Sequence, residues 1–318
     1  MVKNIVLGTR GSELARAQTL LVEKAIRQAH PRITIETKVI ATQGDRARAL
    51  DPRAGRKGLF TAEIERALLA GDVDIAIHSA KDLPSETSPG LEIAAALPRA
   101  AMDDVLVSKH PGGLASLPQD ATVATGSVRR QHQLLWNRAD LHIIDLCGNV
   151  PTRLRKLAGN EWNAIVLARA GLERLGMSLK DEISFEGRRF FLGILSHEIF
   201  LPAGGQGIIA VQVRTDDQST KAVVDRVNDR GTLLCLEAER EFLRRLQGDC
   251  NCPVGVIAKI ENGKMKMRAQ VFLQGAVAPR QGRVEGGPDD RDRIVAELLS
   301  LLGAPAAAQG YGFARKHE

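Results

Sequence analysis

Apolar and polar positions alternate in two different ways along the first two thirds of the chain. The apolar run at residues 5–7 predicts a buried strand, and apolar residues then recur at helical spacing from Leu14 to Ala25. Residues 33–40 alternate between apolar and polar side chains, which predicts a second strand. Because strands and helices keep alternating after this point, we expect α/β domains with mostly parallel sheets.

The same alternation continues until a different pattern replaces it near the C-terminus. Further strands are predicted at residues 73–77, 105–107, 122–124, 143–144, 165–167 and 208–213, and helices at 60–69, at 218–246 and after Ser127, Val150 and Ala170. Residues 254–260, 265–272 and 282–285 predict an antiparallel meander with Asn262-Gly263 as a hairpin turn, and 290–302 a closing helix. The expected fold class is α/β, with two blocks of mostly parallel sheet plus a small α+β block that has an antiparallel sheet.

Composition narrows the class of protein. A chain of 318 residues is long enough for two or three domains, and 44% hydrophobic with 26% charged residues is typical of a globular protein. No apolar run approaches the ~20 residues that a membrane span needs, and residues 1–5 lack the features of a signal peptide. Four cysteines do not make a disulfide framework. We expect a cytoplasmic protein with reduced thiols and no membrane partner.

The charge of the chain points to an anionic ligand. The net charge of +6 comes from 44 Lys and Arg against 38 Asp and Glu, and Arg outnumbers Lys by 31 to 13. The planar guanidinium of Arg suits bidentate binding of carboxylate or phosphate. A binder of single-stranded nucleic acid needs aromatic stacking surfaces, and only 3% of the residues are aromatic, so no nucleic-acid partner is expected. For any single Arg, a solvated surface position is the commoner alternative.

Three predicted strand-to-helix junctions combine small or hydroxyl residues with Arg. They are Thr9-Arg10-Gly11-Ser12, Thr125-Gly126-Ser127-Val128-Arg129-Arg130 and Gly148-Asn149-Val150-Pro151-Thr152-Arg153. Free N–H groups at a helix N-terminus favour an anion, and ligands of open α/β sheets bind at the carboxyl ends of strands. Each junction alone is explained more simply by N-capping. Together they predict a cleft that binds a small molecule with several negative charges.

A polar loop, His78-Ser79-Ala80-Lys81-Asp82-Leu83-Pro84, follows the strand predicted at 73–77 and carries the catalytic candidate. The carboxylate of Asp82 beside Lys81 is expected to stay ionised, and it is suited to stabilise a positive charge that develops during a reaction. The local sequence supports a turn or salt-bridge role for Asp82 about equally well. His78 is better explained as a structural residue.

Cys250 and Cys252 lie in a second predicted loop, Gly248-Asp249-Cys250-Asn251-Cys252-Pro253. One Cys-x-Cys pair without a further Cys or His cluster is a weak signal for zinc, which takes four ligands, so no metal is expected. A loop thiol can instead serve as a nucleophile or as an attachment point. An unreactive cysteine is the commoner case, and it is the expectation for Cys235 inside a predicted helix.

Taken in order, these segments resemble those of the porphobilinogen deaminase family, whose members are also called hydroxymethylbilane synthases. Further segments that match are Thr42-Gln43-Gly44-Asp45, Lys57-Gly58-Leu59-Phe60, Arg129-Arg130-Gln131 and Leu201-Pro202-Ala203-Gly204-Gly205-Gln206-Gly207. Each motif is weak alone, but the ordered set covers nearly the whole chain and is specific.

The resemblance implies three domains and a covalent cofactor. Two domains would resemble the halves of periplasmic binding proteins, at 1–99 with 207–225 and at 100–206, and the third would span 226–318. The implied cofactor is a dipyrromethane, assembled from substrate and joined by a thioether to Cys250. Cys252 stands where the family usually has an apolar residue.

The implied activity is that of a transferase of tetrapyrrole biosynthesis. Four porphobilinogen molecules are joined head to tail with loss of ammonia, and water then releases linear hydroxymethylbilane. Asp82 matches the family's catalytic Asp, which would hold pyrrole N–H groups, stabilise positive charge and assist proton transfers. The residues implied to bind the cofactor are Cys250, Lys81, Thr125, Ser127, Arg129 and Arg130, and those implied to bind the substrate are Arg10, Ser12, Lys57, Phe60 and Arg153.

Three positions depart from the family pattern. Cys147 stands where the family has an Arg that contacts carboxylates, Gly126 stands where Ser is usual, and Arg56 stands where Gly is usual. Loss of one charge-assisted contact is expected to weaken binding by about 1.5–3 kcal/mol. Arg56 and Arg155 are the candidates to compensate for Cys147.

Two other interpretations are compatible with the sequence. One is a catalytically impaired paralogue that still binds pyrrole carboxylates, with Cys147 as its mark. The other is a receptor for a small anion, against which the predicted third domain with its cysteine counts. Nothing in the sequence requires more than one copy of the chain, so we expect a monomer.

Overall fold

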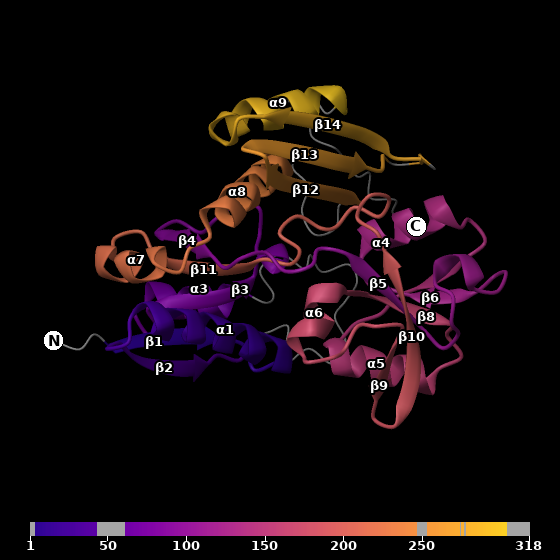
Figure 1. The fold of residues 1–318 in the computed structure, drawn as a ribbon, viewed down its shortest axis with the longest axis horizontal. Helices are drawn as coiled ribbons and strands as arrows, with labels where there is room; N and C mark the ends of the chain where they lie inside the picture. The colour runs from indigo at the N-terminus through magenta and orange to yellow at the C-terminus, as the bar shows by residue number, and fades with distance from the viewer. Residues whose placement is uncertain (1–3, 43–60, 247–252, 274, 277, 304–318) are drawn as a thin grey trace, which may run out of the picture.

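The structure is a computed structural model and describes residues 4–42, 61–246, 253–273, 275–276 and 278–303. Three β-sheets follow one another along the chain, and helices pack against each of them (Figure 1). The first two sheets lie beside each other, and the third unit packs against both: against residues 91–96 of the first and against Gln133 of the second. The α/β class with a small antiparallel C-terminal sheet is confirmed.

The first sheet has five strands in the order β2-β1-β3-β11-β4. Its elements are β1 (Asn4–Thr9), β2 (Thr34–Val39), β3 (Ile75–Ser79), β4 (Leu91–Ala96) and β11 (Ile209–Arg214), covered by α1 (Glu13–Ala29), α3 (Ala62–Leu69) and α7 (Gln218–Asp225). β1 runs parallel to β2 and β3, whereas β11 runs antiparallel to β3 and β4. Fully buried Ile5 and Leu7 of β1 pack with Val22 and Ile26 of α1, as the helical spacing predicts.

The second sheet has six strands in the order β7-β6-β8-β5-β10-β9. Its elements are β5 (Asp104–Ser108), β6 (Thr122–Ala124), β7 (His142–Ile144), β8 (Ala164–Ala168), β9 (Glu182–Phe185) and β10 (Arg188–Leu195), with α4 (Val128–Asn137), α5 (Val150–Gly159) and α6 (Arg169–Arg174). β6 is parallel to β7 and β8, and the strands from β5 to β9 are antiparallel to their neighbours. The carboxyl ends of β6, β7 and β8 therefore lead directly into helices at one edge.

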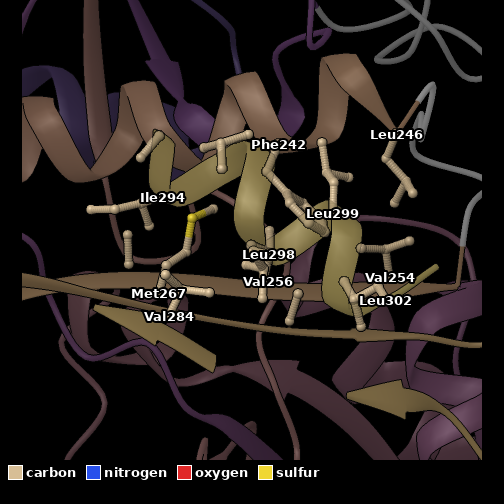
Figure 2. Close-up of a cluster of buried hydrophobic side chains, with 14 of the residues drawn as sticks. Phe242, Leu246, Val254, Val256, Met267, Val284, Ile294, Leu298, Leu299 and Leu302 are labelled. Atoms are coloured by element: carbon tan, nitrogen blue, oxygen red, sulfur yellow. The ribbon is translucent and has the colours of Figure 1, made fainter. Parts of the chain in front are cut away.

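The third sheet is an antiparallel meander covered by two helices. Its elements are β12 (Val254–Glu261), β13 (Lys264–Val271) and β14 (Arg280–Gly286), with α8 (Arg230–Arg245) and α9 (Arg291–Leu301). Every second residue of β12 and β13 points into a core that Phe242 of α8 and Leu298 of α9 complete (Figure 2). Both residues of the predicted Asn262-Gly263 turn have positive φ, 52° and 73°, which the two-residue hairpin requires.

Two predictions about secondary structure were incomplete. The helix predicted at 218–246 is two helices, α7 and α8, because the carboxylate of Asp229 accepts the backbone N–H of Thr232 at 2.7 Å and starts α8. The β9–β10 hairpin and β4 were not predicted. The hairpin turn is Glu186-Gly187, with φ of 48° and 74°, and its flanking sequence is too charged to show a strand period.

A buried ion pair joins the three sheets where their connections meet. Arg99, which follows β4, places Nη1 2.6 Å from Oε1 of Glu239 in α8. The same carboxylate accepts the backbone N–H of Gly205 at 2.6 Å and that of Ala258 in β12 at 2.7 Å. None of the helices in the described part of the chain has the length and apolar character that crossing a bilayer requires.

Candidate active site

The three predicted strand-to-helix junctions are helix N-termini in the structure. The side chains of Ser12, Ser127 and Asn149 accept the backbone N–H groups of Ala15, Arg130 and Thr152 at 3.3, 3.5 and 3.0 Å. These bonds start α1, α4 and α5. The capping role that was the simpler alternative is therefore present at all three junctions.

A cavity of about 540 Å³ lies between the first two sheets, and residues of all three junctions line it. Its lining carries cationic side chains from segments that follow strands of both sheets: Arg10, Lys81, Arg130, Arg153, Lys156 and Arg174. The one carboxylate in the described lining is that of Asp82. A cavity with this excess of positive charge attracts and holds a molecule that carries several carboxylates.

Asp82 reaches the cavity from a 3₁₀ turn, η1 (Ala80–Asp82), that directly follows β3. The turn is held by the backbone N–H of Ala80, which donates to the carbonyl of Ile208 at 3.0 Å. Gly205 lies against it with a φ of 75°, and a Cβ there would be 2.9 Å from the backbone carbon of Ala80. The position of Asp82 therefore depends on a close backbone contact that only glycine permits.

Lys81 stands beside Asp82, and its amine has a lower pKa than an ordinary lysine. Burial lowers the pKa of Lys81 to about 8, and the charge of Arg130 adds to this shift. The carboxylate of Asp82 opposes the shift but does not cancel it. Near neutral pH the Lys81 amine therefore carries a positive charge that a bound carboxylate would stabilise further.

A buried network orients Arg130 at the second junction. Its Nη2 lies 2.6 Å from Oδ1 of Asp104, and Nη2 of Arg129 lies 2.8 Å from Oδ2 of the same carboxylate. Burial alone would raise the pKa of Asp104, but the two guanidinium groups outweigh it and hold that pKa far below its usual range. Arg130 lines the cavity, and within the described residues its buried Nε has no hydrogen-bond partner.

Several predicted site residues lie outside the cavity lining that the structure describes. Arg129 is buried and directs Nη1 to the carbonyl of Leu201 at 2.7 Å. Thr125 is fully buried, and its hydroxyl accepts the backbone N–H of Ser127 at 3.3 Å. Lys57, Phe60, Cys250 and also Arg56 and Cys252 lie outside the described residues. Arg10, Ser12, Lys81, Asp82, Arg130 and Arg153 do line the cavity.

Two cationic residues of the lining, Arg174 and Lys156, were not predicted from the sequence. Arg174 ends α6 and donates to the carbonyl of Gly207 at 2.7 Å, and burial lowers its pKa to about 10. A signal was available, because α6 follows the carboxyl end of β8 just as the other junctions follow their strands. Lys156, in the second half of α5, offered no such signal.

Cys147 lies in the cavity lining, as its place before the third junction predicts. Arg155, one candidate to compensate for it, points away from the cavity and pairs with Glu186 at 2.7 Å on the surface. Its guanidinium lies 5.8 Å from the centre of the Phe185 ring. Arg155 is thus engaged elsewhere, and the neighbour that does reach Cys147 is Lys156.

Fold and site together define a class: a two-sheet α/β protein with a cationic cleft between the sheets and a small third unit. A profile described as "Porphobilinogen deaminase, dipyromethane cofactor binding domain" matches residues 5–222, and "Porphobilinogen deaminase, C-terminal domain" matches residues 233–296. The chain belongs to the porphobilinogen deaminase family.

Curated relatives agree with this assignment. The porphobilinogen deaminase of Roseiflexus sp. (strain RS-1) is 41% identical over 288 residues, which is 90% of each chain. That of Syntrophomonas wolfei is 41% identical over 311 residues, 96% of this chain and 98% of the relative. The similarity therefore extends across all three sheets.

Solved structures with a similar arrangement include two binding proteins. The methionine-binding protein MetQ is 13% identical with a TM-score of 0.42 and covers 72% of this chain and 92% of its own. The BenM effector-binding domain with benzoate is 14% identical with a TM-score of 0.40 and covers 71% of this chain and 91% of its own. At these TM-scores, neither structure bears on the site.

The chemistry of the cleft fits the cofactor of this family. Each pyrrole of a dipyrromethane carries an acetate and a propionate, so the group is a polyanion. The cleft offers six cationic side chains against one carboxylate in its described lining, and the buried Nε of Arg130 lacks a partner among the described residues. A donor set of this kind suits carboxylate ligands, and the chain uses dipyrromethane as its cofactor.

Proposed function

We propose that this chain is a hydroxymethylbilane synthase that joins four porphobilinogen molecules with loss of ammonia and releases the linear product with water. One observation carries the assignment of the site: Asp82 is the one carboxylate in the described lining of a cleft that is otherwise cationic. The reaction is inferred from family membership, and the roles of individual residues are inferred from the lining of the cleft.

Asp82 is the proposed catalytic residue. The carboxylate of Asp82 accepts hydrogen bonds from pyrrole N–H groups and stabilises the positive charge that develops as ammonia leaves. It is also placed to take up and return a proton at the reacting carbon. When bound, the dipyrromethane supplies the nucleophilic carbon of its terminal pyrrole.

The cationic side chains bind and orient carboxylates on both sides of Asp82. We assign Arg10, Ser12 and Arg153 to the substrate and Lys81, Ser127 and Arg130 to the cofactor. Arg129 and Thr125 contribute through their neighbours: Arg129 shares the Asp104 carboxylate with Arg130, and Thr125 holds the backbone of Ser127. Fixed donors of this kind favour one orientation of each pyrrole ring.

The covalent anchor is Cys250, with Lys57 and Phe60 as further substrate contacts. These three assignments rest on the family motifs in the sequence. The thioether would form between the sulfur of Cys250 and the first pyrrole unit, and Cys252 would remain a free thiol. We propose domains at 1–99 with 207–225, at 100–206 and at 226–318; the insertion of β11 into the first sheet supports the discontinuous first domain.

Intact mass of the purified protein tests the anchor. The wild type should exceed the mass of the bare polypeptide by one dipyrromethane, Cys250→Ser should have the bare mass, and Cys252→Ser should keep the adduct. An adduct that survives in Cys250→Ser and disappears in Cys252→Ser would move the anchor. A monomer in the cytoplasm is the proposed state, and size-exclusion chromatography with light scattering checks the first part.

A further inference from the structure

Lys156 and Cys147 form a pair in the cavity lining that the assigned substrate contacts do not include. The Nζ of Lys156 lies 3.2 Å from the carbonyl oxygen of Cys147 and 3.5 Å from its Sγ. Both residues line the cavity, and both are partly exposed to it. We propose that Lys156 is a substrate-binding residue, which binds a side-chain carboxylate of porphobilinogen at the Cys147 corner of the cleft; this inference rests on the proposed function.

The side chain of Lys156 points toward the N-terminus of α5, so it does not have the usual role of a lysine near the C-terminus of a helix. Such a lysine normally stabilises the negative end of the helix dipole. Lys156 instead reaches back past the start of α5 to the carbonyl of Cys147, which precedes that helix. There its charge lies near the positive end of the dipole, which is unfavourable until an anion is present.

The charge of Lys156 also lacks a balancing carboxylate. Among the residues that the structure describes, the hydrogen-bond partners of its Nζ are the carbonyl oxygen and the sulfur of Cys147, and neither is a carboxylate. Arg130, by contrast, pairs with Asp104, and Arg155 pairs with Glu186. Lys156 therefore keeps a positive charge available for a ligand in the cleft.

A short neutral residue at 147 is what allows this geometry. Two cations held close together at a protein surface repel each other strongly, so an Arg at 147 would drive the Lys156 ammonium away. Cys147 instead leaves the space to Lys156. The charge that the sequence indicated as missing at 147 is supplied from position 156, and Arg155 does not supply it.

The test combines a thiol probe with substrate kinetics. Holoenzyme is treated with iodoacetate, an anion, or iodoacetamide, its neutral analogue, and alkylation of Cys147 is followed by peptide mass spectrometry. Lys156→Met should lower the iodoacetate-to-iodoacetamide rate ratio at Cys147 roughly fivefold, because an adjacent cation favours the anionic reagent. It should also raise KM for porphobilinogen roughly tenfold, with a smaller change in kcat.

Matched variants separate this role from a structural one. Arg155→Met removes the neighbouring cation on the same helix and should leave the ratio and KM unchanged, and Lys156→Arg should keep both near the wild type. Lys156→Gln replaces the Met variant if the latter unfolds. An unchanged ratio or an unchanged KM in the neutral variant overturns the proposal. If the wild type does not consume porphobilinogen, the proposed function fails, while the ratio still decides whether Lys156 attracts an anion.

Discussion

The guanidinium of Arg130 lies 2.6 Å from the carboxylate of Asp104, and this buried contact connects the cleft to the core of the second sheet. Asp104 is fully buried at the start of β5 and also binds Arg129 at 2.8 Å and the side-chain amide of Gln206 at 3.0 Å. One carboxylate thus orients a cleft residue, a helix and a connecting segment.

Replacing Asp104 should therefore lower the stability of the protein. Asp104→Asn leaves two buried guanidinium groups without a charge partner, and we expect a loss of about 3–5 kcal/mol in the free energy of unfolding, measured with urea. Glu186→Gln, which breaks the exposed pair with Arg155, is the control and should cost less than about 1 kcal/mol. Equal losses in the two variants would contradict the role given to Asp104.

Gly205 should be needed for the position of Asp82. Gly205→Ala combines a φ of 75° with a Cβ 2.9 Å from the backbone of Ala80, so it should displace the turn that carries Asp82 and reduce kcat by at least about tenfold. Gly71→Ala has a similar φ of 77° but no atom within 4 Å of its Cβ. It should lose about 1 kcal/mol of stability and keep its kcat. Similar kcat values in both variants would show that the contact with Ala80 is unimportant.

How much of this site the sequence predicts differs from residue to residue. Arg10, Arg130 and Arg153 lie in the strand-to-helix junctions that follow β1, β6 and β7. Because α/β topology brings such junctions to one edge of a sheet, the local sequence pattern was sufficient to predict these residues. Lys156 reaches the cleft only because its side chain extends back along α5, and no short motif encodes that direction. Arg129 illustrates the opposite case: the same motif predicts it, but its guanidinium is buried against Asp104 and the carbonyl of Leu201 and does not line the described cavity.

Some elements of the fold were likewise predicted from the sequence, and others were not. Strands and helices with a clear period, such as β3 and α1, were predicted close to their observed bounds. β4 and the β9–β10 hairpin were missed because packing and pairing partners distant in sequence stabilise them, with β4 beside β11 and β10 beside β5. The break between α7 and α8 depends on a single capping carboxylate, Asp229, inside an otherwise helical pattern.

The pKa of Lys81 sets a pH dependence for catalysis. Because burial lowers this pKa to about 8, the ammonium loses its proton and its attraction for carboxylates as the pH rises through 8. We expect kcat/KM of the wild type to fall several-fold between pH 7.5 and pH 9, a range on either side of that pKa. Lys81→Arg keeps its charge over this range, so its relative decline should be smaller. Parallel profiles for the two proteins would contradict this assignment.

His78 should make the fold sensitive to acid. Burial lowers the pKa of His78 to about 4, although Glu65 and a hydrogen bond with Gln212 at 3.0 Å oppose the shift. The unfolded chain binds this proton near pH 6.5 and the folded chain only near pH 4, so stability is lost as the pH falls through this window. The loss approaches about 3 kcal/mol at pH 4.

The contribution of His78 is measured as the difference between the urea stability of the wild type and that of His78→Gln at each pH from 7 to 4. The variant keeps an N–H donor for Gln212 and should lose less stability on acidification. His142→Gln, at an exposed position, should follow the wild type. A His78→Gln protein that loses as much stability as the wild type would contradict a buried, neutral His78.

The most direct test of the account is intact mass of Asp82→Asn before and after incubation with porphobilinogen, because it separates catalysis by Asp82 from cofactor attachment at Cys250. The variant should carry the dipyrromethane adduct when purified, and it should gain further pyrrole units at least about a hundredfold more slowly than the wild type. Addition of pyrrole units at the wild-type rate would contradict the central role of Asp82 in this cleft.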